Sequence, residues 1–317
     1  MAASPLCIFV HRGPGRPEEK NRMMEDWDHP KPKDLDRAVA AARQAMPAYD
    51  EILAFYGSVF KEQAADSETI AVTADAPDTA RVEIARKEGF PLVAPVELPV
   101  DLSHAAALLL RLCRAASGAT APLAAAASAI QSAIVENRLH PGEILTARRE
   151  NSSDRFAALA AELDIPFEVL AFFADESLAP SLVAGRRRVA AHWQQDAAHD
   201  KGYCPVCGSA PALGVLEEDG RRFLICSVCR QRWQVQRVRC AACGQTDAQK
   251  LYYIYSEEEP AYRIDACDVC RHYVKTVDRR RLARLFYPPL EQVLTVHLDM
   301  VAAENKLAPV PGANWRD

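Results

Sequence analysis

Eight cysteines in the second half of the sequence form four C-x-x-C pairs. The pairs are separated by 18, 10 and 23 residues, and they are Cys204/Cys207, Cys226/Cys229, Cys240/Cys243 and Cys267/Cys270. A C-x-x-C turn can present both of its sulfurs to one metal ion, and two such turns complete a tetrahedral shell of four thiolates. Burial of reduced cysteines does not by itself produce paired spacing four times, so the pattern predicts metal binding.

The segment between the second and third pairs indicates how the eight cysteines divide. Its sequence, "RQRWQVQRVR", contains no Gly, Pro, Asn or Asp and alternates mainly like a strand. Ten extended residues span about 33 Å, whereas the ligands of one ion lie within about 4 Å of one another. We therefore expect one ion on Cys204, Cys207, Cys226 and Cys229 and a second on Cys240, Cys243, Cys267 and Cys270. A cross-braced arrangement, in which the first and third pairs share an ion, is the alternative.

The chemistry of these shells is limited by their composition. Four thiolates suit zinc and iron equally well by geometry. "CPVCG" and "CAACG" place Gly after the second sulfur, which is typical of rubredoxin-like knuckles and of zinc ribbons. Neither shell leaves an open coordination position for a Lewis acid. Because the sequence also lacks a phosphate-binding Gly-rich loop, G-x-S-x-G and H-E-x-x-H, it predicts a protein that is not an enzyme.

Other candidate ligands lack such a pattern. His192 and His199 precede the first pair, and we expect them to be solvated because four cysteines already close each shell. Cys113 in "LLLRLCRAA" is predicted to lie in a helical core, and Cys7 lies in a Pro- and Gly-rich arm.

Helical periodicity dominates the first half of the chain. A helix is expected from Asp34 to about Ala65, interrupted at Pro47, and another begins near a Ser103 cap and ends at Gly118. The Pro-rich stretch "EGFPLVAPVELPVDLS" predicts an extended loop. Further helices are expected at about 120–138, 153–163, 166–175 and 179–193.

The second half changes to strand-like alternation. Hairpins are expected in "PALGVLEEDGRRFLIC" and "KLYYIYSEEEPAYRIDAC", and a C-terminal helix from Asp278, broken at Pro288 and Pro289. The sequence thus predicts an α+β protein: a mostly helical N-terminal domain, two tandem small β modules of the rubredoxin-like or zinc-ribbon type, and a C-terminal helix. The expected boundaries are a flexible arm at 1–33, the helical domain at 34–198, the metal modules at 199–237 and 238–278, and a C-terminal helix and tail at 279–317.

Composition constrains the partners and the compartment. Lys201 to Pro289 contains fifteen Lys and Arg against ten Asp and Glu, and two divalent ions with eight thiolates bring this segment close to neutral. That balance does not favour a nucleic-acid-binding ribbon, although this class stays open. We expect neither a signal peptide nor a membrane-inserted segment. Paired cysteines without an export signal favour a reducing compartment, so a cytoplasmic protein is expected.

The cysteine segments resemble a known family. "YCPVCGSAP", "CSVC", "CAACG" and "DACDVCRHYVKTVD" are similar to the motifs of the formate dehydrogenase accessory protein FdhE family. The Ala-rich helical first half and the helix around "MPAYDEILAFYGSVFKEQ" are also similar, and the resemblance covers roughly residues 34 to 305.

The resemblance implies a cytoplasmic maturation factor that binds the catalytic subunit of respiratory formate dehydrogenase. It favours iron in both four-cysteine sites, with zinc as the alternative. It also suggests a weaker role for His272, Tyr273, Lys275 and Thr276, which follow the last pair and are expected to face a partner. The second hypothesis for the function is a rubredoxin-like electron-transfer protein.

Overall fold

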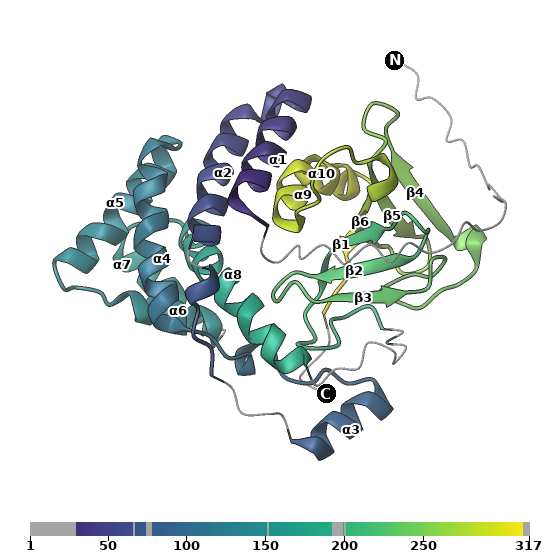
Figure 1. The fold of residues 1–317 in the computed structure, drawn as a ribbon, viewed down its shortest axis with the longest axis horizontal. Helices are drawn as coiled ribbons and strands as arrows, with labels where there is room; N and C mark the ends of the chain where they lie inside the picture. Colours follow the sequence, from purple (N-terminus) through teal and green to yellow (C-terminus); the bar gives the residue numbers. More distant parts are fainter. Residues whose placement is uncertain are drawn as a thin grey trace.

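A helical region lies beside a mixed β-sheet in the computed structural model, which describes residues 30–65, 67–73, 78–150, 152–191, 199 and 201–312 (Figure 1). Nearly all of the expected arm, Cys7 and His192 lie outside these ranges. The helices of the first half are α1 (Pro32–Ala45), α2 (Asp50–Ala65), α3 (Thr79–Glu88), α4 (Leu102–Ala115), α5 (Ala121–Val135), α6 (Pro141–Arg149), α7 (Ser153–Glu162) and α8 (Phe167–Ala190).

Proline and aspartate set several helix boundaries. Pro47 separates α1 from α2, as predicted. The cap of α4 is Asp101 rather than Ser103, because the Asp101 carboxylate accepts from the backbone N–H of His104 at 2.9 Å. Cys113 is buried on α4, as expected, and burial raises the pKa of its thiol to about 12.

Helix α8 corrects the prediction of two separate helices at 166–175 and 179–193. It continues through Pro180, whose missing N–H leaves the carbonyl of Glu176 without its usual helical donor. The side-chain amide of Gln63 on α2 donates to that carbonyl at 2.9 Å. A contact between two helices thus compensates for the internal proline.

The described residues of the second half contain seven strands in one sheet. They are β1 (Pro211–Leu216), β2 (Arg222–Cys226), β3 (Arg232–Val235), β4 (Leu251–Tyr255), β5 (Tyr262–Cys267), β6 (His272–Asp278) and β7 (Ala308–Pro309). The order is β3-β2-β1-β6-β5-β4, and β7 pairs with β6. Each predicted module supplies three antiparallel strands, and β1 and β6 join the modules in parallel, with Gly214 opposite Thr276.

Buried and partly buried charges reinforce the join between the two modules. Asp265 on β5 accepts from the Thr276 hydroxyl at 2.8 Å and pairs with Arg263 at 2.7 Å. It also reaches Arg222 on β2 at 3.2 Å, across the two central strands. This contact links strands of both modules within one continuous sheet.

The C-terminal helix begins later than predicted. Residues Arg279–Arg281 form a single 3-10 turn, and α9 (Pro288–Leu294) starts at the prolines that were expected to break a helix. Proline fits the first turn of a helix, where its N–H would have no partner. Helix α10 (Val296–Glu304) follows, and both helices lie between α1 and α2 and the sheet (Figure 1).

None of the helices in the described ranges combines the length and the apolar character of a membrane-spanning segment.

Candidate metal centres

All four C-x-x-C pairs form the same type of tight turn. The residue after the second cysteine has a positive φ in each: 73° at Gly208, 55° at Arg230, 76° at Gly244 and 59° at Arg271. The backbone N–H of this residue donates to the carbonyl of the first cysteine in three of them, at 2.8 Å for Gly208, 3.1 Å for Gly244 and 2.9 Å for Arg271. The two glycines could be recognised from the sequence, whereas the two arginines could not, because arginine rarely adopts this conformation.

The first site brings together the sulfurs of Cys204, Cys207, Cys226 and Cys229. The sulfur of Cys207 lies 3.5 Å from those of Cys226 and Cys229, and the sulfurs of Cys204 and Cys229 are 3.6 Å apart. The backbone N–H of Cys207 donates to the sulfur of Cys204, and that of Cys229 donates to the sulfur of Cys226, each at 3.4 Å. All four side chains are at most 1% exposed.

The second site brings together the sulfurs of Cys240, Cys243, Cys267 and Cys270. The sulfurs of Cys240 and Cys270 are 3.6 Å apart, and those of Cys243 and Cys267 are 3.8 Å apart. Cys267 is buried, but Cys270 is half-buried and Cys243 is exposed. The grouping of the eight cysteines is the one argued from spacing, and the cross-braced alternative is not seen.

Both donor sets fit a metal ion. The sulfurs of a tetrahedral shell with bonds near 2.3 Å lie about 3.8 Å apart, close to the separations in both clusters. Burial raises the pKa of the Cys204 and Cys229 thiols well above the usual range, so four thiolates there require a cation. The geometry suits zinc and iron alike.

The segment between the sites differs in part from its prediction. It contains β3 only from Arg232 to Val235, and the chain bends over residues 237–239 before the third pair. The two sites are separate although the segment is not a straight strand. The ladder between β2 and β3 keeps this strand attached to the first module.

Arg230 connects the first site to the helical region. Its guanidinium lies 5.7 Å from the ring centre of Tyr287 and donates to the Tyr287 hydroxyl at 3.3 Å. The Tyr287 ring packs edge-on against Phe60 of α2. Burial raises the pKa of Glu176 on α8, and the charge of Arg230 opposes that rise.

Substitution of Arg230 separates its backbone role from its side-chain role. Arg230→Gly and Arg230→Ala both remove the contact with Tyr287, but only glycine accepts a φ of 55° without strain. We expect the alanine variant to be about 1 kcal/mol less stable than the glycine variant. Urea unfolding of the metal-loaded chains measures this difference, and an alanine variant at least as stable as the glycine variant would contradict the strain argument.

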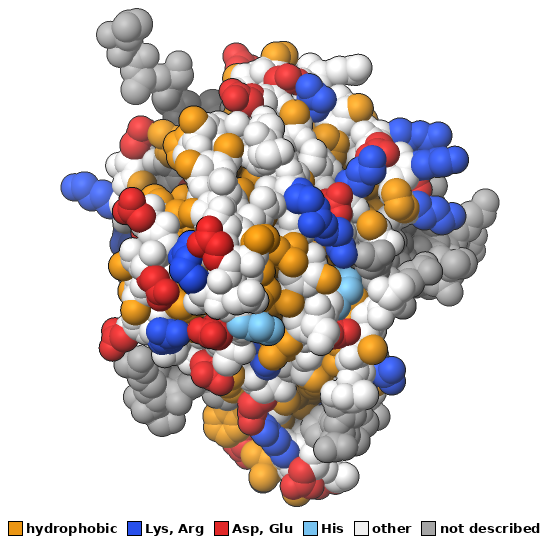
Figure 2. Space-filling view, turned by 90° about the vertical axis from the view of Figure 1, so that its left-hand side faces the viewer, with side chains coloured by type: hydrophobic (Ala, Val, Ile, Leu, Met, Phe, Trp, Pro, Cys, Tyr) orange, Lys and Arg blue, Asp and Glu red, His pale blue; other side chains and the backbone are white. Residues whose placement is uncertain are grey.

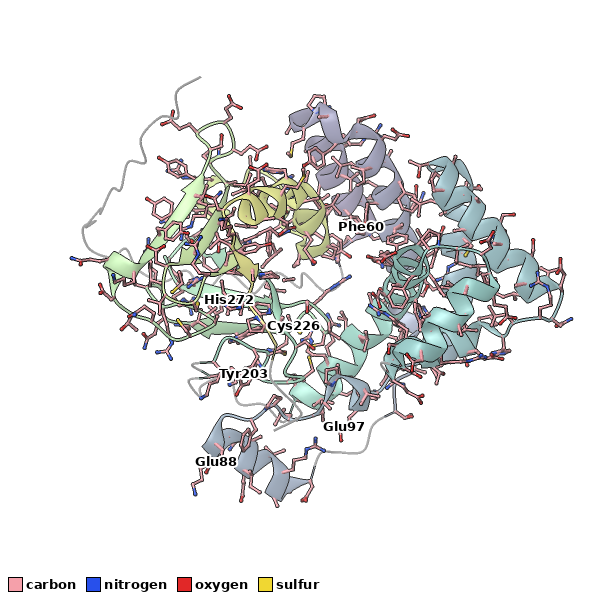
Figure 3. The ribbon with its side chains drawn as sticks, turned by 180° about the vertical axis from the view of Figure 1, so that it is seen from behind. Phe60, Glu88, Glu97, Tyr203, Cys226 and His272 are labelled. Atoms are coloured by element: carbon pink, nitrogen blue, oxygen red, sulfur yellow. The ribbon has the colours of Figure 1, made fainter. Side chains whose placement is uncertain are left out.

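A part of the helical region encloses the first site, which the sequence did not predict. In the Pro-rich loop, the backbone N–H of Leu92 donates to the carbonyl of Pro205 at 3.1 Å. The N–H of Val93 donates to the carbonyl of Val206 at 3.0 Å. Side chains of α3 and this loop share an apolar cluster with the four cysteines of the first site. Figure 3 shows Tyr203 and Cys226 on the side of the sheet that faces α3 and the loop at Glu97.

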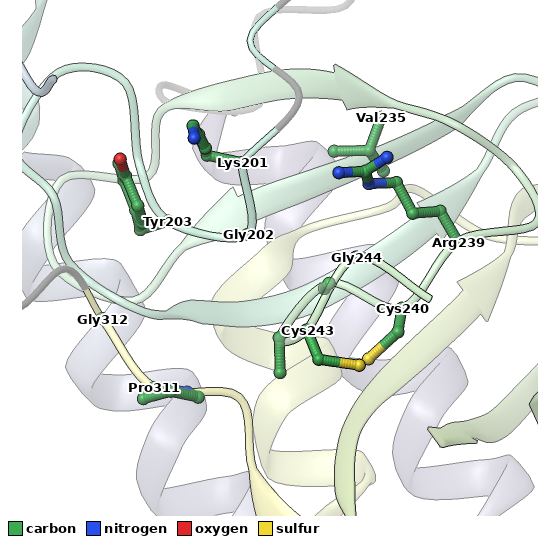
Figure 4. Close-up of a pocket in the computed structure, with 12 residues that line it drawn as sticks. Lys201, Gly202, Tyr203, Val235, Arg239, Cys240, Cys243, Gly244, Pro311 and Gly312 are labelled. Atoms are coloured by element: carbon green, nitrogen blue, oxygen red, sulfur yellow. The ribbon is translucent and has the colours of Figure 1, made fainter. Parts of the chain in front are cut away.

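The second site borders a pocket of about 350 Å³. One wall is the segment Lys201–Tyr203 before the first pair, and another is the turn of the third pair (Figure 4). Val235, Arg239 and the two residues Pro311 and Gly312, which follow β7, complete the lining. Both cysteines of the third pair line this pocket, so within the described residues one edge of the second site is less covered than the first site.

Gly202 is packed so closely against the third pair that a side chain does not fit. A Cβ atom there would lie 1.6 Å from the carbonyl oxygen of Ala241. We expect Gly202→Ala to cost about 1–3 kcal/mol, as overpacking does, and to speed release of the second metal to a chelator. Gly118→Ala is the control, because no atom lies within 4 Å of its Cβ position. Equal stability and equal metal release in both variants would argue against this packing.

The four residues after the last pair are mostly buried in the folded chain. Tyr273, Lys275 and Thr276 are buried, and only His272 is half-exposed. The Tyr273 hydroxyl and the Lys275 ammonium both donate to Asp299 of α10, each at 2.7 Å. These side chains anchor α10 and the join between the modules, and a contact of theirs with a partner stays a prediction.

His199 also departs from its prediction. It is 5% exposed, its Nε2 lies 2.8 Å from the carbonyl oxygen of Tyr203, and its ring packs against the Tyr203 ring. It belongs to the packing before the first turn rather than to a solvated surface.

Comparisons with known proteins agree with this architecture. Residues 203–237 match the model of the FdhE central domain. The chain is 39% identical over 108 residues to the FdhE homolog of Aquifex aeolicus and 39% identical over 77 residues to FdhE of Escherichia coli O1:K1. These matches cover 33% and 23% of this chain, and they span only 38% and 24% of the lengths of those relatives.

A solved structure extends the likeness to most of the fold. The crystal structure of FdhE from Pseudomonas aeruginosa superposes with a TM-score of 0.61 at 21% identity, over 89% of this chain and 95% of that one.

The fold and sites define a class of protein in which a helical domain precedes one sheet carrying two four-cysteine clusters. The matched central domain and the shared fold confirm the resemblance of this chain to the FdhE family.

Proposed function

We propose that this chain is an accessory protein for formate dehydrogenase and that it binds the catalytic subunit of that enzyme during maturation. The observation that carries the proposal is the position of the FdhE central domain. It spans residues 203–237, which contain all four cysteines of the first site together with β1, β2 and β3. The part that matches the family's central domain is thus the part that carries the first four-cysteine cluster.

A scaffold role fits the site better than catalysis. Each shell consists of four thiolates and leaves no position for a substrate on the ion. In the first site, Cys204, Cys207, Cys226 and Cys229 would hold the ion that fixes the turns of the first module. In the second, Cys240, Cys243, Cys267 and Cys270 would do the same for the second module. Iron, which the family resemblance favours, would supply one-electron redox chemistry when bound, and zinc would supply shape alone.

A binding measurement tests the proposal. The metal-loaded full chain is titrated calorimetrically into purified formate dehydrogenase catalytic subunit, and saturable binding is expected. The metal-depleted chain is the control and should bind more weakly, because the turns lose their fixed shape without the ions. Absence of binding by the metal-loaded chain would overturn the proposal. We further propose that this encounter takes place in the cytoplasm, where thiolate sites stay reduced.

The exposure of Cys243 supports electron transfer as the second candidate function. An exposed thiolate ligand gives electrons a short route between the second ion and a docked protein. Reversible bleaching of a visible absorption band during turnover of a redox partner would support this candidate. A chain loaded only with zinc that still restores formate dehydrogenase activity would eliminate it.

Nucleic acid binding receives little support from the small excess of basic residues in Lys201 to Pro289, which the thiolates of two metal sites would nearly cancel, or from the surface of the helical region. Figure 2 shows the face of the helical region at the left of Figure 1, where acidic and basic side chains are interspersed. Binding to nucleic acid needs cations gathered on one face. A titration with DNA and RNA at low salt is expected to show no binding.

A further inference from the structure

The first metal site is covered by a strap, which consists of α3 and the following part of the Pro-rich loop, residues 79–98. Val82 and Ala85 of α3 and Leu92 and Leu98 of the loop are buried. All four belong to the apolar cluster that contains the cysteines of the first site. Because these cysteines are themselves at most 1% exposed, solvent and chelators do not reach their sulfurs in this conformation.

The strap is attached to the turn of the first C-x-x-C pair by backbone hydrogen bonds. The N–H groups of Leu92 and Val93 donate to the carbonyls of the two residues between the cysteines of that pair, at 3.1 and 3.0 Å. The Tyr203 hydroxyl, just before the pair, donates to the carbonyl of Gly89 at 3.1 Å. The turn keeps the shape that aligns these groups while its cysteines share one ion. The attachment of the strap therefore depends on the occupancy of the site.

The last residues of the strap are held by the helical region instead. The Arg149 guanidinium of α6 donates to the carbonyls of Val96 and Leu98, at 2.7 and 2.9 Å. The next residue, Pro99, packs so closely on α8 that a Cβ atom at Gly185 would lie 2.0 Å from its carbonyl oxygen. This end does not depend on the metal turn, so it can act as the pivot for movement of the rest of the strap.

Helix α3 has little support of its own. It contains ten residues, and an isolated helix of that length is marginally stable in water. Figure 1 shows α3 apart from the other helices of the first half. Its two buried side chains belong to the cluster around the first site. We therefore expect α3 to lose its structure when this contact is lost.

We propose that the strap is a gate for the first metal ion. The ion enters or leaves the site only when residues 79–93 lift from the turn about the pivot at Val96 to Leu98, and loss of the ion releases the strap. The gate requires only an ion on four buried thiolates, zinc or iron, and it does not depend on the proposed function.

Hydrogen exchange followed by mass spectrometry tests whether the ion holds the strap. Cys226→Ser removes a ligand of the first site and Cys243→Ser removes one of the second, so the two variants form a matched pair. The amides of residues 79–93 are expected to exchange nearly as fast as in an unfolded peptide in Cys226→Ser, while α4 stays protected. In Cys243→Ser they should exchange at the wild-type rate.

Two results of the exchange measurement would overturn the proposal. In the first, the strap of Cys226→Ser is as protected as that of the wild-type chain, so the ion does not hold it. In the second, α4 loses its protection together with the strap, so the strap does not open as a separate unit.

Chelator competition tests whether the strap limits exchange of the ion. The parent protein is the Cys243→Ser chain, in which the tightly held ion is the one in the first site. Because opening must precede release, the release rate should reach a plateau as the chelator concentration rises. Val93→Ala removes apolar surface from the strap and should raise this plateau about tenfold.

Val189→Ala is the matched control for the kinetic test. It makes the same substitution on α8, at a residue that is also buried in the cluster around the first site. Because α8 does not lift, the plateau should stay near that of the parent protein. Equal acceleration by Val93→Ala and Val189→Ala, or a release rate that increases in proportion to chelator concentration without a plateau, would show that the strap is not a gate.

Discussion

Replacing Cys226 with serine is expected to release one of the two metal ions and to destabilise the protein by about 4 kcal/mol or more, a range typical of a lost metal. Cys226 ends β2 and is 1% exposed, and its sulfur lies 3.5 Å from that of Cys207. A serine hydroxyl there is a poor ligand for a soft ion, and the remaining thiolates would be buried with insufficient positive charge. The apolar cluster around the site, which includes Val82 and Leu98 of the helical region, would lose its centre.

The matched variant for this prediction is Cys243→Ser in the second site. Cys243 is exposed, so water can take the vacant coordination position and screen the remaining charge. We expect this variant to bind its second ion more weakly but to lose much less stability than Cys226→Ser. Elemental analysis and urea unfolding of both proteins measure the two effects. Equal destabilisation by the two substitutions would show that enclosure does not distinguish the sites.

Replacing Arg284 with alanine is expected to destabilise the protein by about 3–5 kcal/mol, the cost of breaking a buried ion pair from one side. Its guanidinium donates to both carboxylate oxygens of Glu291, at 2.6 and 2.8 Å, and to the Tyr262 hydroxyl at 2.7 Å. Glu291 on α9 is fully buried, and its carboxylate also accepts from the Tyr262 hydroxyl at 2.9 Å. Alanine at 284 would leave this carboxylate buried without its cation.

A double substitution serves as the control for Arg284. Arg284→Met combined with Glu291→Met removes both charges and keeps much of the volume, so it should cost far less than Arg284→Ala alone. Chemical unfolding of the metal-loaded proteins gives the comparison. A loss below about 1 kcal/mol for Arg284→Ala, the size of a surface ion pair, would mean that this network does not hold α9 against β5.

The sequence predicted the two four-cysteine clusters well because the information that specifies them is local. C-x-x-C fixes a turn, and the hairpins between the first and second pairs and between the third and fourth return the chain to its starting point. The grouping into two sites was predicted from a straight strand between the second and third pairs. The grouping is right, although only Arg232–Val235 of that segment is a strand. The predominantly helical first half and the break at Pro47 also followed from periodicity and from the properties of proline.

Features that depend on distant contacts were not predictable in the same way. The passage of α8 through Pro180 depends on Gln63, more than a hundred residues earlier in the chain. The union of the two modules depends on parallel pairing between β1 and β6, which local alternation does not specify. The Pro-rich stretch was expected to be an extended loop, whereas it contains a 3-10 turn at Pro95–Glu97. Its role in enclosing the first site appears only when the chain is folded.

The two arginines at positive φ show a further limit of prediction from the sequence. Arg230 and Arg271 occupy positions where Gly208 and Gly244 are used in the other turns. Both have contacts that glycine cannot make: Arg230 with Tyr287, and Arg271 with the Tyr252 hydroxyl and the carbonyl of Asn305. In each of these turns the arginine has a strained backbone conformation, and its side chain contacts another part of the fold.

X-ray absorption spectroscopy combined with elemental analysis of the anaerobically purified chain tests the central claim most directly. Two independent four-thiolate sites predict two metal ions per chain, each with four sulfur ligands at about 2.3 Å. A single ion per chain, or a coordination shell containing nitrogen or oxygen in place of sulfur, would contradict the account.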